Sequence, residues 1–144
     1  MFIIATDGAC KGNPGPGGWA FVVFNEDGDQ VDYRFEGHTD TTNNRMELLA
    51  FINACEYIRD TFEYGENVII KIDSTYVLKG SQEWLSGWVS KNYKNVKNED
   101  LWRIVESLRP VWSRCTMRWV KGHSGDFHNE LADRYANIGC ESIR

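Results

Sequence analysis

The spacing of hydrophobic and polar residues divides the first part of the chain into three short segments. Residues 2–5 and 19–24 are apolar runs, and apolar side chains at Val31, Tyr33 and Phe35 alternate with polar ones. Turn-forming sequences at 12–18 and 26–29 separate these segments. Short runs joined by tight connections predict a meander of three antiparallel strands, the first ending before Asp7.

The spacing then becomes helical. One apolar stripe predicts a helix over 44–61, and its members are Leu48, Phe51, Ile52, Cys55, Ile58 and Phe62. Residues 67–72 and 116–120 are typical of strands, whereas 75–88 and a segment beginning near Leu101 are helical. A last helix is expected over 127–140, with a stripe of Phe127, Leu131, Tyr135 and Ile138. This order predicts an α/β fold with one five-stranded mixed sheet, an antiparallel meander plus two parallel strands, flanked by helices.

Length and composition indicate one domain over residues 1–144. The chain is 42% hydrophobic, which is enough for an ordinary core. Its opening apolar run is too short for an export signal or a membrane span, so we expect a cytoplasmic protein that does not contact membranes. The four cysteines are scattered without zinc-ligand spacing and are expected to be reduced thiols. Cys10 stays a candidate for function because it is close to Asp7.

The charge is unevenly distributed. The net charge is -5, yet residues 88–121 carry eight basic and three acidic side chains. A basic contact surface beside an acidic site that binds cations would give this asymmetry. For Arg103, Arg109 and Arg114, the solvated face of a helix is the preferred interpretation.

Two aspartates follow predicted strands. Asp7 follows the first strand and Asp73 the strand at 67–72, and side chains at such strand ends face the crevice where α/β proteins bind ligands. A helix N-cap is the alternative for Asp73, which precedes a helical segment.

Two further acids lie beside helical stripes. Glu47 precedes Leu48 and Asp133 is close to Leu131, although either one alone would be read as a solvated helix residue. If Asp7, Glu47, Asp73 and Asp133 converged, their charges would repel one another unless cations joined them. Carboxylate oxygens suit Mg²⁺ or Mn²⁺, and two such ions can promote phosphodiester hydrolysis. Spacing alone does not prove the convergence.

A histidine lies on a glycine-containing loop. His123 is flanked by Gly122 and Gly125, so we expect an exposed, titratable group on a mobile segment. It could transfer a proton near neutral pH, although a surface role is the commoner one for such a residue.

Four sequence blocks resemble the type 1 ribonuclease H family. They are Asp7 to Gly18, Thr41 to Leu48, Asp73 to Val77, and Trp119 to Asp133. The resemblance covers nearly the whole chain in order, with an acid in each block, and it implies the ribonuclease H fold. It further implies that Asp7, Glu47, Asp73 and Asp133 hold two Mg²⁺ ions, for which Mn²⁺ substitutes, and that His123 is a mobile helper in proton transfer and product departure.

The implied reaction is endonucleolytic hydrolysis of the RNA strand of an RNA/DNA hybrid, which leaves 5'-phosphate and 3'-hydroxyl ends. The resemblance places Cys10, Asn13, Asn43 and Asn44 along the RNA minor groove, where 2'-hydroxyls can donate and accept hydrogen bonds. It places Thr42 at a DNA phosphate. Trp84 and Trp88 would lie near the deoxyribose backbone, with core packing as an equal alternative. Lys91 would contact phosphate, and Lys94 and Lys97 could add contacts.

The sequence departs from the family pattern in three places. Only residues 89–100 separate Trp88 from the next helix, where many bacterial relatives carry a longer basic protrusion, so weaker binding is expected. Thr75 stands where relatives often have a base-contacting Gln, and Asp40 stands where some have an Arg near the phosphate pocket, so neither contact is expected here. Asp126 and His128 change the loop around His123.

Two other functions remain open. One is a noncatalytic module that binds RNA/DNA hybrids, and the other is an integrase-like nuclease that cuts DNA with the same fold. The complete set of acids favours the enzyme, which we expect to act as a monomer.

Overall fold

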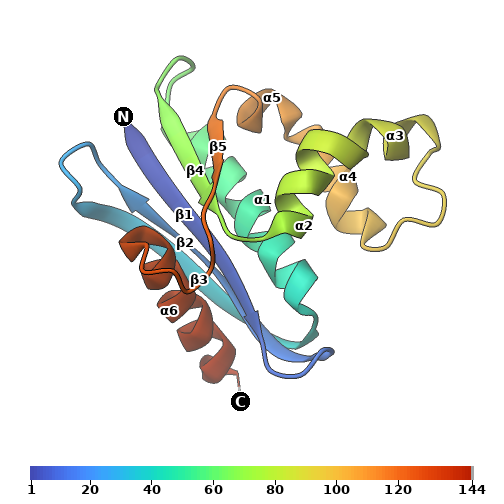
Figure 1. Cartoon of the computed structure of the whole chain (residues 1–144), viewed down its shortest axis with the longest axis horizontal. Helices are drawn as coiled ribbons and strands as arrows, with labels where there is room; N and C mark the ends of the chain where they lie inside the picture. Colours follow the sequence, from blue (N-terminus) through green and yellow to red (C-terminus); the bar gives the residue numbers. More distant parts are fainter. Residues whose placement is uncertain (144) are drawn as a thin grey trace.

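A five-stranded sheet forms the centre of the computed structural model, which describes residues 1–143. Its strand order is β3-β2-β1-β4-β5 (Figure 1). The strands are β1 (Phe2–Cys10), β2 (Gly15–Phe24), β3 (Gln30–Thr41), β4 (Val68–Ile72) and β5 (Thr116–Trp119). The first three pair antiparallel, and β4 and β5 extend the sheet in parallel from β1. The predicted mixed sheet is therefore confirmed.

The end predicted for the first strand is wrong. β1 continues through Asp7 to Cys10 because β2 pairs with it along that whole length, as far as Cys10 opposite Gly17. Its pairing with β4 ends earlier, at Thr6 opposite Ile72. Asp7 thus lies inside a strand, at the point where one of its two neighbours stops.

Two long helices cover opposite faces of the sheet. They are α1 (Asn43–Thr61) and α6 (Phe127–Ser142) (Figure 1). The stripe predicted for α1 is confirmed, since Leu48, Phe51, Ile52, Cys55 and Ile58 are buried in the main core. That core lies between α1 and the sheet and also receives Ile4, Ile70 and Ile72.

The stripe predicted for α6 is confirmed in part, because Leu131 and Tyr135 pack on the small core beneath the helix, and it is wrong at its two ends. Phe127 and Ile138 are exposed, and the buried residues of the helix are Asn129, Ala132, Ala136, Gly139 and Cys140. Small residues are required because the helix backbone approaches glycines of the sheet: a Cβ on Gly18 would lie 2.2 Å from the Ala136 carbonyl oxygen. Larger side chains at these positions would separate the two layers.

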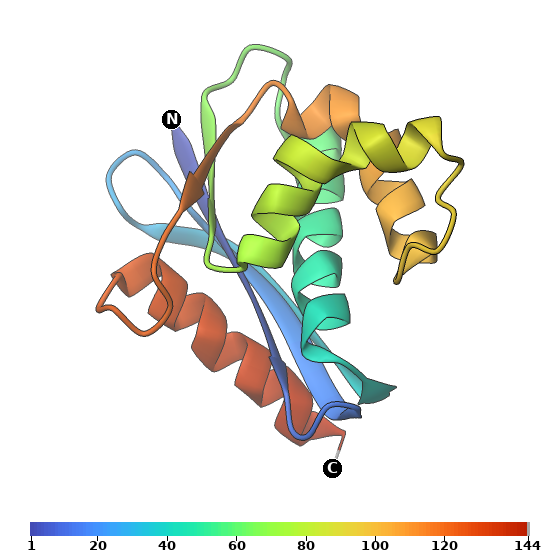
Figure 2. The same cartoon turned by 45° about the vertical axis from the view of Figure 1, so that its right-hand side comes forward.

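Shorter helices pack on the far side of α1. They are α2 (Thr75–Lys79), a π-helical turn η1 (Gly80–Trp84), α3 (Leu85–Ser90), α4 (Glu99–Ser107) and α5 (Arg109–Trp112) (Figure 2). The single helix predicted over 75–88 is therefore three joined pieces. Gly80 leaves room for the Trp102 ring, because a Cβ there would lie 2.0 Å from a ring carbon.

None of the helices within residues 1–143 is long and apolar enough to cross a membrane. The four cysteines are free thiols, with Cys55 and Cys140 buried and Cys10 and Cys115 half-buried. This agrees with the reduced state expected from their spacing.

Candidate active site

The register of the parallel strands brings two aspartates together. Thr6 of β1 and Ile72 of β4 form the last pair between these strands, and each of them is followed by an aspartate. Asp7 and Asp73 are therefore neighbours across the strand pair. Asp73 does not cap the following helix, because the cap is Ser74, whose hydroxyl accepts a hydrogen bond from the Val77 amide at 3.1 Å. The N-cap alternative for Asp73 is thus excluded.

Glu47 joins this pair from α1 because the strand and the helix approach closely at Gly8. A Cβ on Gly8 would lie 2.5 Å from the Glu47 amide nitrogen, so a larger residue would push the two elements apart. Glu47 lies in the second turn of α1 and is only 7% exposed.

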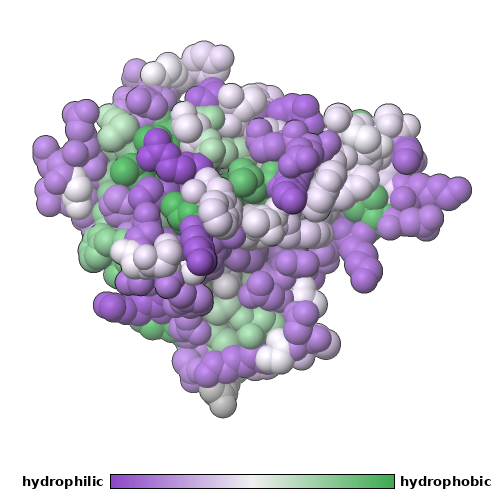
Figure 3. Space-filling view, in the orientation of Figure 1, coloured by the Kyte–Doolittle hydropathy of each residue, from purple (hydrophilic) through white to green (hydrophobic). Residues whose placement is uncertain are grey.

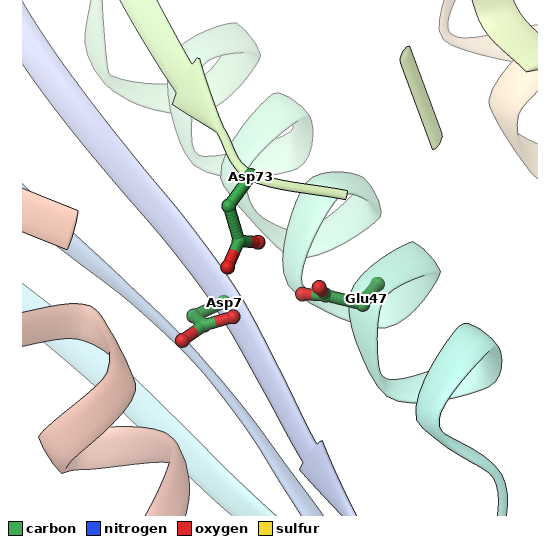
Figure 4. A group of neighbouring side chains, drawn as sticks. All are labelled: Asp7, Glu47 and Asp73. Atoms are coloured by element: carbon green, nitrogen blue, oxygen red, sulfur yellow. The ribbon is translucent and has the colours of Figure 1, made fainter. Parts of the chain in front are cut away.

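The three carboxylates face one space. One oxygen each from Asp7, Glu47 and Asp73 lies within 4.8 Å of the others. Figure 4 shows the Asp73 side chain, just after the end of β4, and the Glu47 side chain on α1 turned toward Asp7. Three acids from three elements converge as the sequence suggested.

The carboxylates perturb one another. Burial raises the pKa of Asp7 from 3.8 to about 9, helped by the charges of Asp73 and Asp133 and by a side-chain hydrogen bond with Asp133. Burial also raises the pKa of Glu47 well above its usual value, with further contributions from Asp7 and Asp73. Buried like charges are unfavourable, so a bound cation would be stabilised here.

One oxygen of the group has an unused lone pair. Within residues 1–143, Asp73 Oδ1 is buried and accepts no hydrogen bond. Buried polar atoms are nearly always paired, so an unpaired carboxylate oxygen beside two others fits a site for a hard divalent cation.

The fourth acid approaches from α6. Asp133 interacts directly with Asp7, although it is not among the three acids whose oxygens are closest. Its Oδ1 accepts a hydrogen bond from Asn137 Nδ2 at 3.3 Å. Asp133 and His123 both line a surface groove of about 770 Å³ along α6. The structure therefore gathers three of the four acids, places Asp133 beside Asp7, and places His123 in the groove that Asp133 also lines.

The residues expected along the RNA strand form a second cluster beside the acids. Asn13 Oδ1 accepts a hydrogen bond from the Asn43 amide at 3.0 Å, which joins the β1–β2 turn to the start of α1. Thr42 is the N-cap of α1. The half-buried Cys10 thiol donates to the Thr41 carbonyl at 3.5 Å, and the side chains of Asn13, Asn43 and Asn44 are exposed.

The two tryptophans differ in their surroundings. Their ring centroids are 5.9 Å apart, but Trp88 also packs on Trp102 at 5.0 Å, whereas Trp84 is 40% exposed. Trp88 is therefore part of the core, whereas part of the Trp84 ring is exposed at the surface.

Lys91, Lys94 and Lys97 are exposed on the segment between α3 and α4. This segment projects from the molecule in Figures 1 and 2, and Figure 3 shows that it is largely hydrophilic. Its backbone is unusual, because several non-glycine residues adopt positive φ: Asn92, Tyr93, Asn95 and Asn98.

Sequence reasoning missed the contacts that fix this projecting segment. Arg45, next to the asparagines of α1, binds both carboxylate oxygens of Asp100 at 3.0 and 2.7 Å and also donates to Asn98 Oδ1 at 3.2 Å. Asn98 in turn donates to the Tyr76 hydroxyl at 3.1 Å. These pairs are 53, 55 and 22 residues apart, so no local pattern could reveal them.

Comparison with known proteins identifies the family to which the chain is similar. The family model described as RNase H matches residues 1–141. The ribonuclease H of Albidiferax ferrireducens is 46% identical over 144 residues, covering 96% of this chain and 93% of that protein. Ribonuclease HI of Caulobacter vibrioides is 46% identical over 141 residues, covering 94% and 90%.

Solved structures agree with this result. RNase H1 from the halophilic archaeon Halobacterium salinarum NRC-1 is 26% identical, with a TM-score of 0.74 and 98% of each chain covered. LC11-RNase H1, solved in complex with an RNA/DNA hybrid, has a TM-score of 0.77 and 21% identity over 99% of each chain, which shows a shared fold.

Proposed function

The chain belongs to the ribonuclease H family, and from that membership we propose that it hydrolyses the RNA strand of RNA/DNA hybrids. The observation that carries the proposal is the convergence of Asp7, Glu47 and Asp73, with one oxygen of each within 4.8 Å of the others. We propose that residues 1–144 act as one catalytic domain and as a monomer, because the site draws on β1, α1, β4 and α6 of a single chain.

We further propose that Asp7, Glu47, Asp73 and Asp133 hold two Mg²⁺ ions, for which Mn²⁺ can substitute. The oxygen-only donor set and the unpaired Asp73 Oδ1 support a hard cation. When bound, such ions supply the positive charge that activates an attacking water and stabilises the leaving oxygen, giving 5'-phosphate and 3'-hydroxyl ends.

The fold holds the carboxylates in place before any cation binds. The sheet register fixes Asp7 and Asp73, and the close approach at Gly8 fixes Glu47, so these three acids would need little rearrangement to hold cations. Burial raises the pKa of Asp7 to about 9, so a cation held here would compete with a proton for Asp7, because the carboxylate form is the ligand. His123 is proposed to move a proton near the leaving group from the groove it shares with Asp133.

Substrate choice is assigned to the polar cluster at the start of α1. Cys10, Asn13, Asn43 and Asn44 would contact the RNA minor groove, where 2'-hydroxyls distinguish RNA from DNA. Thr42 would hold a phosphate of the DNA strand. Trp84 would pack on deoxyribose, and Lys91 would add a phosphate contact. The exposure of Asn13, Asn43 and Asn44, the hydrogen bond that joins Asn13 to Asn43, and the exposure of Trp84 and Lys91 support this assignment.

The test compares three substrates at increasing Mg²⁺: an RNA/DNA hybrid, double-stranded RNA and double-stranded DNA, each end-labelled on either strand. Cleavage of the RNA strand of the hybrid alone, stopped by EDTA and slowed on the order of 1,000-fold by Asp7→Asn, is the expected result. The matched control is Asp27→Asn, an exposed turn carboxylate. Cleavage of duplex DNA would favour an integrase-like nuclease, and binding without cleavage would favour a noncatalytic module.

A further inference from the structure

A lysine lies on the face of the sheet that α6 covers. Lys71 is in β4, paired with Ala5 of β1 and Arg118 of β5, and its side chain is only 12% exposed. Ala5 belongs to the apolar cluster beneath α6, which also contains Ala132. A lysine in such a place needs a partner, because a buried unpaired charge is costly.

The partners of Lys71 lie at the start of α6. Its Nζ donates to Asp126 Oδ2 at 2.8 Å and lies 3.0 Å from His128 Nδ1. The other oxygen of Asp126 caps α6 by accepting from the Asn129 amide at 3.0 Å. His128 packs on Phe24 with ring centroids 4.3 Å apart.

The protonation states favour this arrangement. Burial, followed by the nearby Lys71 charge, lowers the pKa of His128, so its ring is neutral at neutral pH and can accept from the ammonium group. Burial acts to raise the pKa of Asp126, but hydrogen bonds from Lys71 and the Asn129 amide outweigh it and lower that pKa overall. Lys71 therefore pairs with a carboxylate and a neutral imidazole.

The loop that carries His123 is tied to β4 at both ends. At its start, the Val120 amide donates to the Ile72 carbonyl at 2.9 Å, and Trp119 Nε1 donates to the Asp73 carbonyl at 3.2 Å. At its end, Asp126 binds Lys71. The anchors are thus the consecutive residues 71–73, the last of which is a proposed metal ligand.

The loop between the anchors is short and lies close to Asp73. His123 adopts a left-handed backbone with φ of 56°. A Cβ on the neighbouring Gly122 would lie 3.1 Å from Asp73 Oδ2, so this part of the loop lies directly against the acid. A shift of Asp126 would be transmitted to His123 across only two residues.

We propose that Lys71 and Asp126 are positioning residues, whose ion pair holds the loop of residues 121–125 so that His123 stays beside the acidic site. The inference rests on the proposed function, since it assigns a role in that same reaction. It differs from a purely structural role because it requires the effect of the ion pair on turnover to pass through His123.

The test removes the ion pair without leaving a lone buried charge. In the Lys71→Met/Asp126→Asn variant, the methionine keeps the apolar stem and asparagine remains a good N-cap. The control is Arg59→Met/Asp60→Asn, which removes an exposed ion pair at 2.8 Å near the end of α1. Both are made in the wild-type chain and in His123→Ala, and kcat and KM are measured on the hybrid.

We expect kcat to fall about tenfold with an unchanged KM in the wild-type background, and less than about twofold in the His123→Ala background. The control should change neither value. An equal fall of kcat in both backgrounds would overturn the proposal, because the ion pair would then act independently of His123.

A second readout needs no catalysis. Amide hydrogen exchange at residues 122–125 should become faster in the double variant, while exchange within α1 stays the same. Unchanged loop exchange would overturn the proposal even if the wild-type chain cleaved hybrids well. If the wild-type chain cleaved nothing, the proposed function would fail and loop exchange would still report on the anchor. Should the double variant not fold, Lys71→Met alone, which leaves Asp126 with its hydrogen bond from the Asn129 amide, is measured in the same way.

Discussion

Asp7 and Asp73 each follow the last paired residue of the parallel β1–β4 ladder, which ends at Thr6 opposite Ile72. The same backbone register that builds the sheet therefore sets two carboxylates side by side. Burial and mutual repulsion then keep the Asp7 pKa at about 9. The ionised carboxylates of this site repel one another, and a bound divalent cation would offset that repulsion.

Stability without metal should depend on the pH through Asp7. Its folded pKa, about 9, lies above the ordinary 3.8, so its stabilising contribution is complete below pH 3.8 and is lost as the pH rises through 9. In EDTA, we expect the Tm of the wild-type chain to fall relative to Asp7→Asn by on the order of 5 °C between roughly pH 5 and pH 9.

Thermal unfolding followed by circular dichroism measures this difference, with Asp27→Asn as the control that should follow the wild-type curve. Added Mg²⁺ should restore more of the wild-type Tm at pH 9 than at pH 5, since a bound proton competes with the cation. Parallel curves for wild type and Asp7→Asn would show that Asp7 does not carry the repulsion.

His123→Ala should slow turnover without abolishing it. The acids would still hold cations, whereas the proton transfer assigned to His123 would be lost, for a decrease in kcat on the order of 100-fold. Single-turnover cleavage of a labelled hybrid gives this rate, and His38→Ala, a change on β3, is the control. Complete loss of cleavage in a variant that keeps the wild-type Tm would contradict the helper role.

Substitutions of the two tryptophans should have different effects, one on hybrid binding and the other on stability. Trp84→Ala is expected to weaken hybrid binding with little change in the unfolding free energy, since Trp84 is 40% exposed. Trp88→Ala should cost about 3 kcal/mol of stability because its ring packs on Trp102. Fluorescence anisotropy and urea unfolding measure the two effects. A large stability loss in Trp84→Ala with normal binding would reverse the assignment.

Lys91→Ala should reduce the salt dependence of hybrid binding. Each phosphate contact contributes about 1 to the slope of log K against log salt concentration, so the slope should become shallower by about that amount. Lys79→Ala, an exposed lysine at the end of α2, provides the comparison. An unchanged slope for Lys91→Ala would mean that Lys91 does not contact phosphate.

Local patterns in the sequence predict the order of strands and helices along the chain and the buried face of α1. They also single out the four acids as candidates. They do so because Leu48, Phe51 and Ile58 repeat at helical spacing and because the family motifs surround each acid. The true end of β1 was missed, since polar Thr6 and Asp7 interrupt the apolar run while β2 keeps pairing to Cys10.

Other features depend on contacts that no local pattern contains. The small-residue face of α6 follows from its approach to Gly18, and the Lys71–Asp126 pair joins residues 55 apart in sequence. The sequence also could not distinguish Trp84 from Trp88, because only the position of Trp102 makes one of them part of the core.

The most direct test is a crystal structure of the protein grown with Mn²⁺ and an RNA/DNA hybrid, with anomalous scattering used to locate the ions. The account predicts Mn²⁺ peaks among the oxygens of Asp7, Glu47 and Asp73, with the hybrid's RNA strand crossing that site. Carboxylates turned away from one another, with no anomalous peak between them while the hybrid is bound, would contradict it.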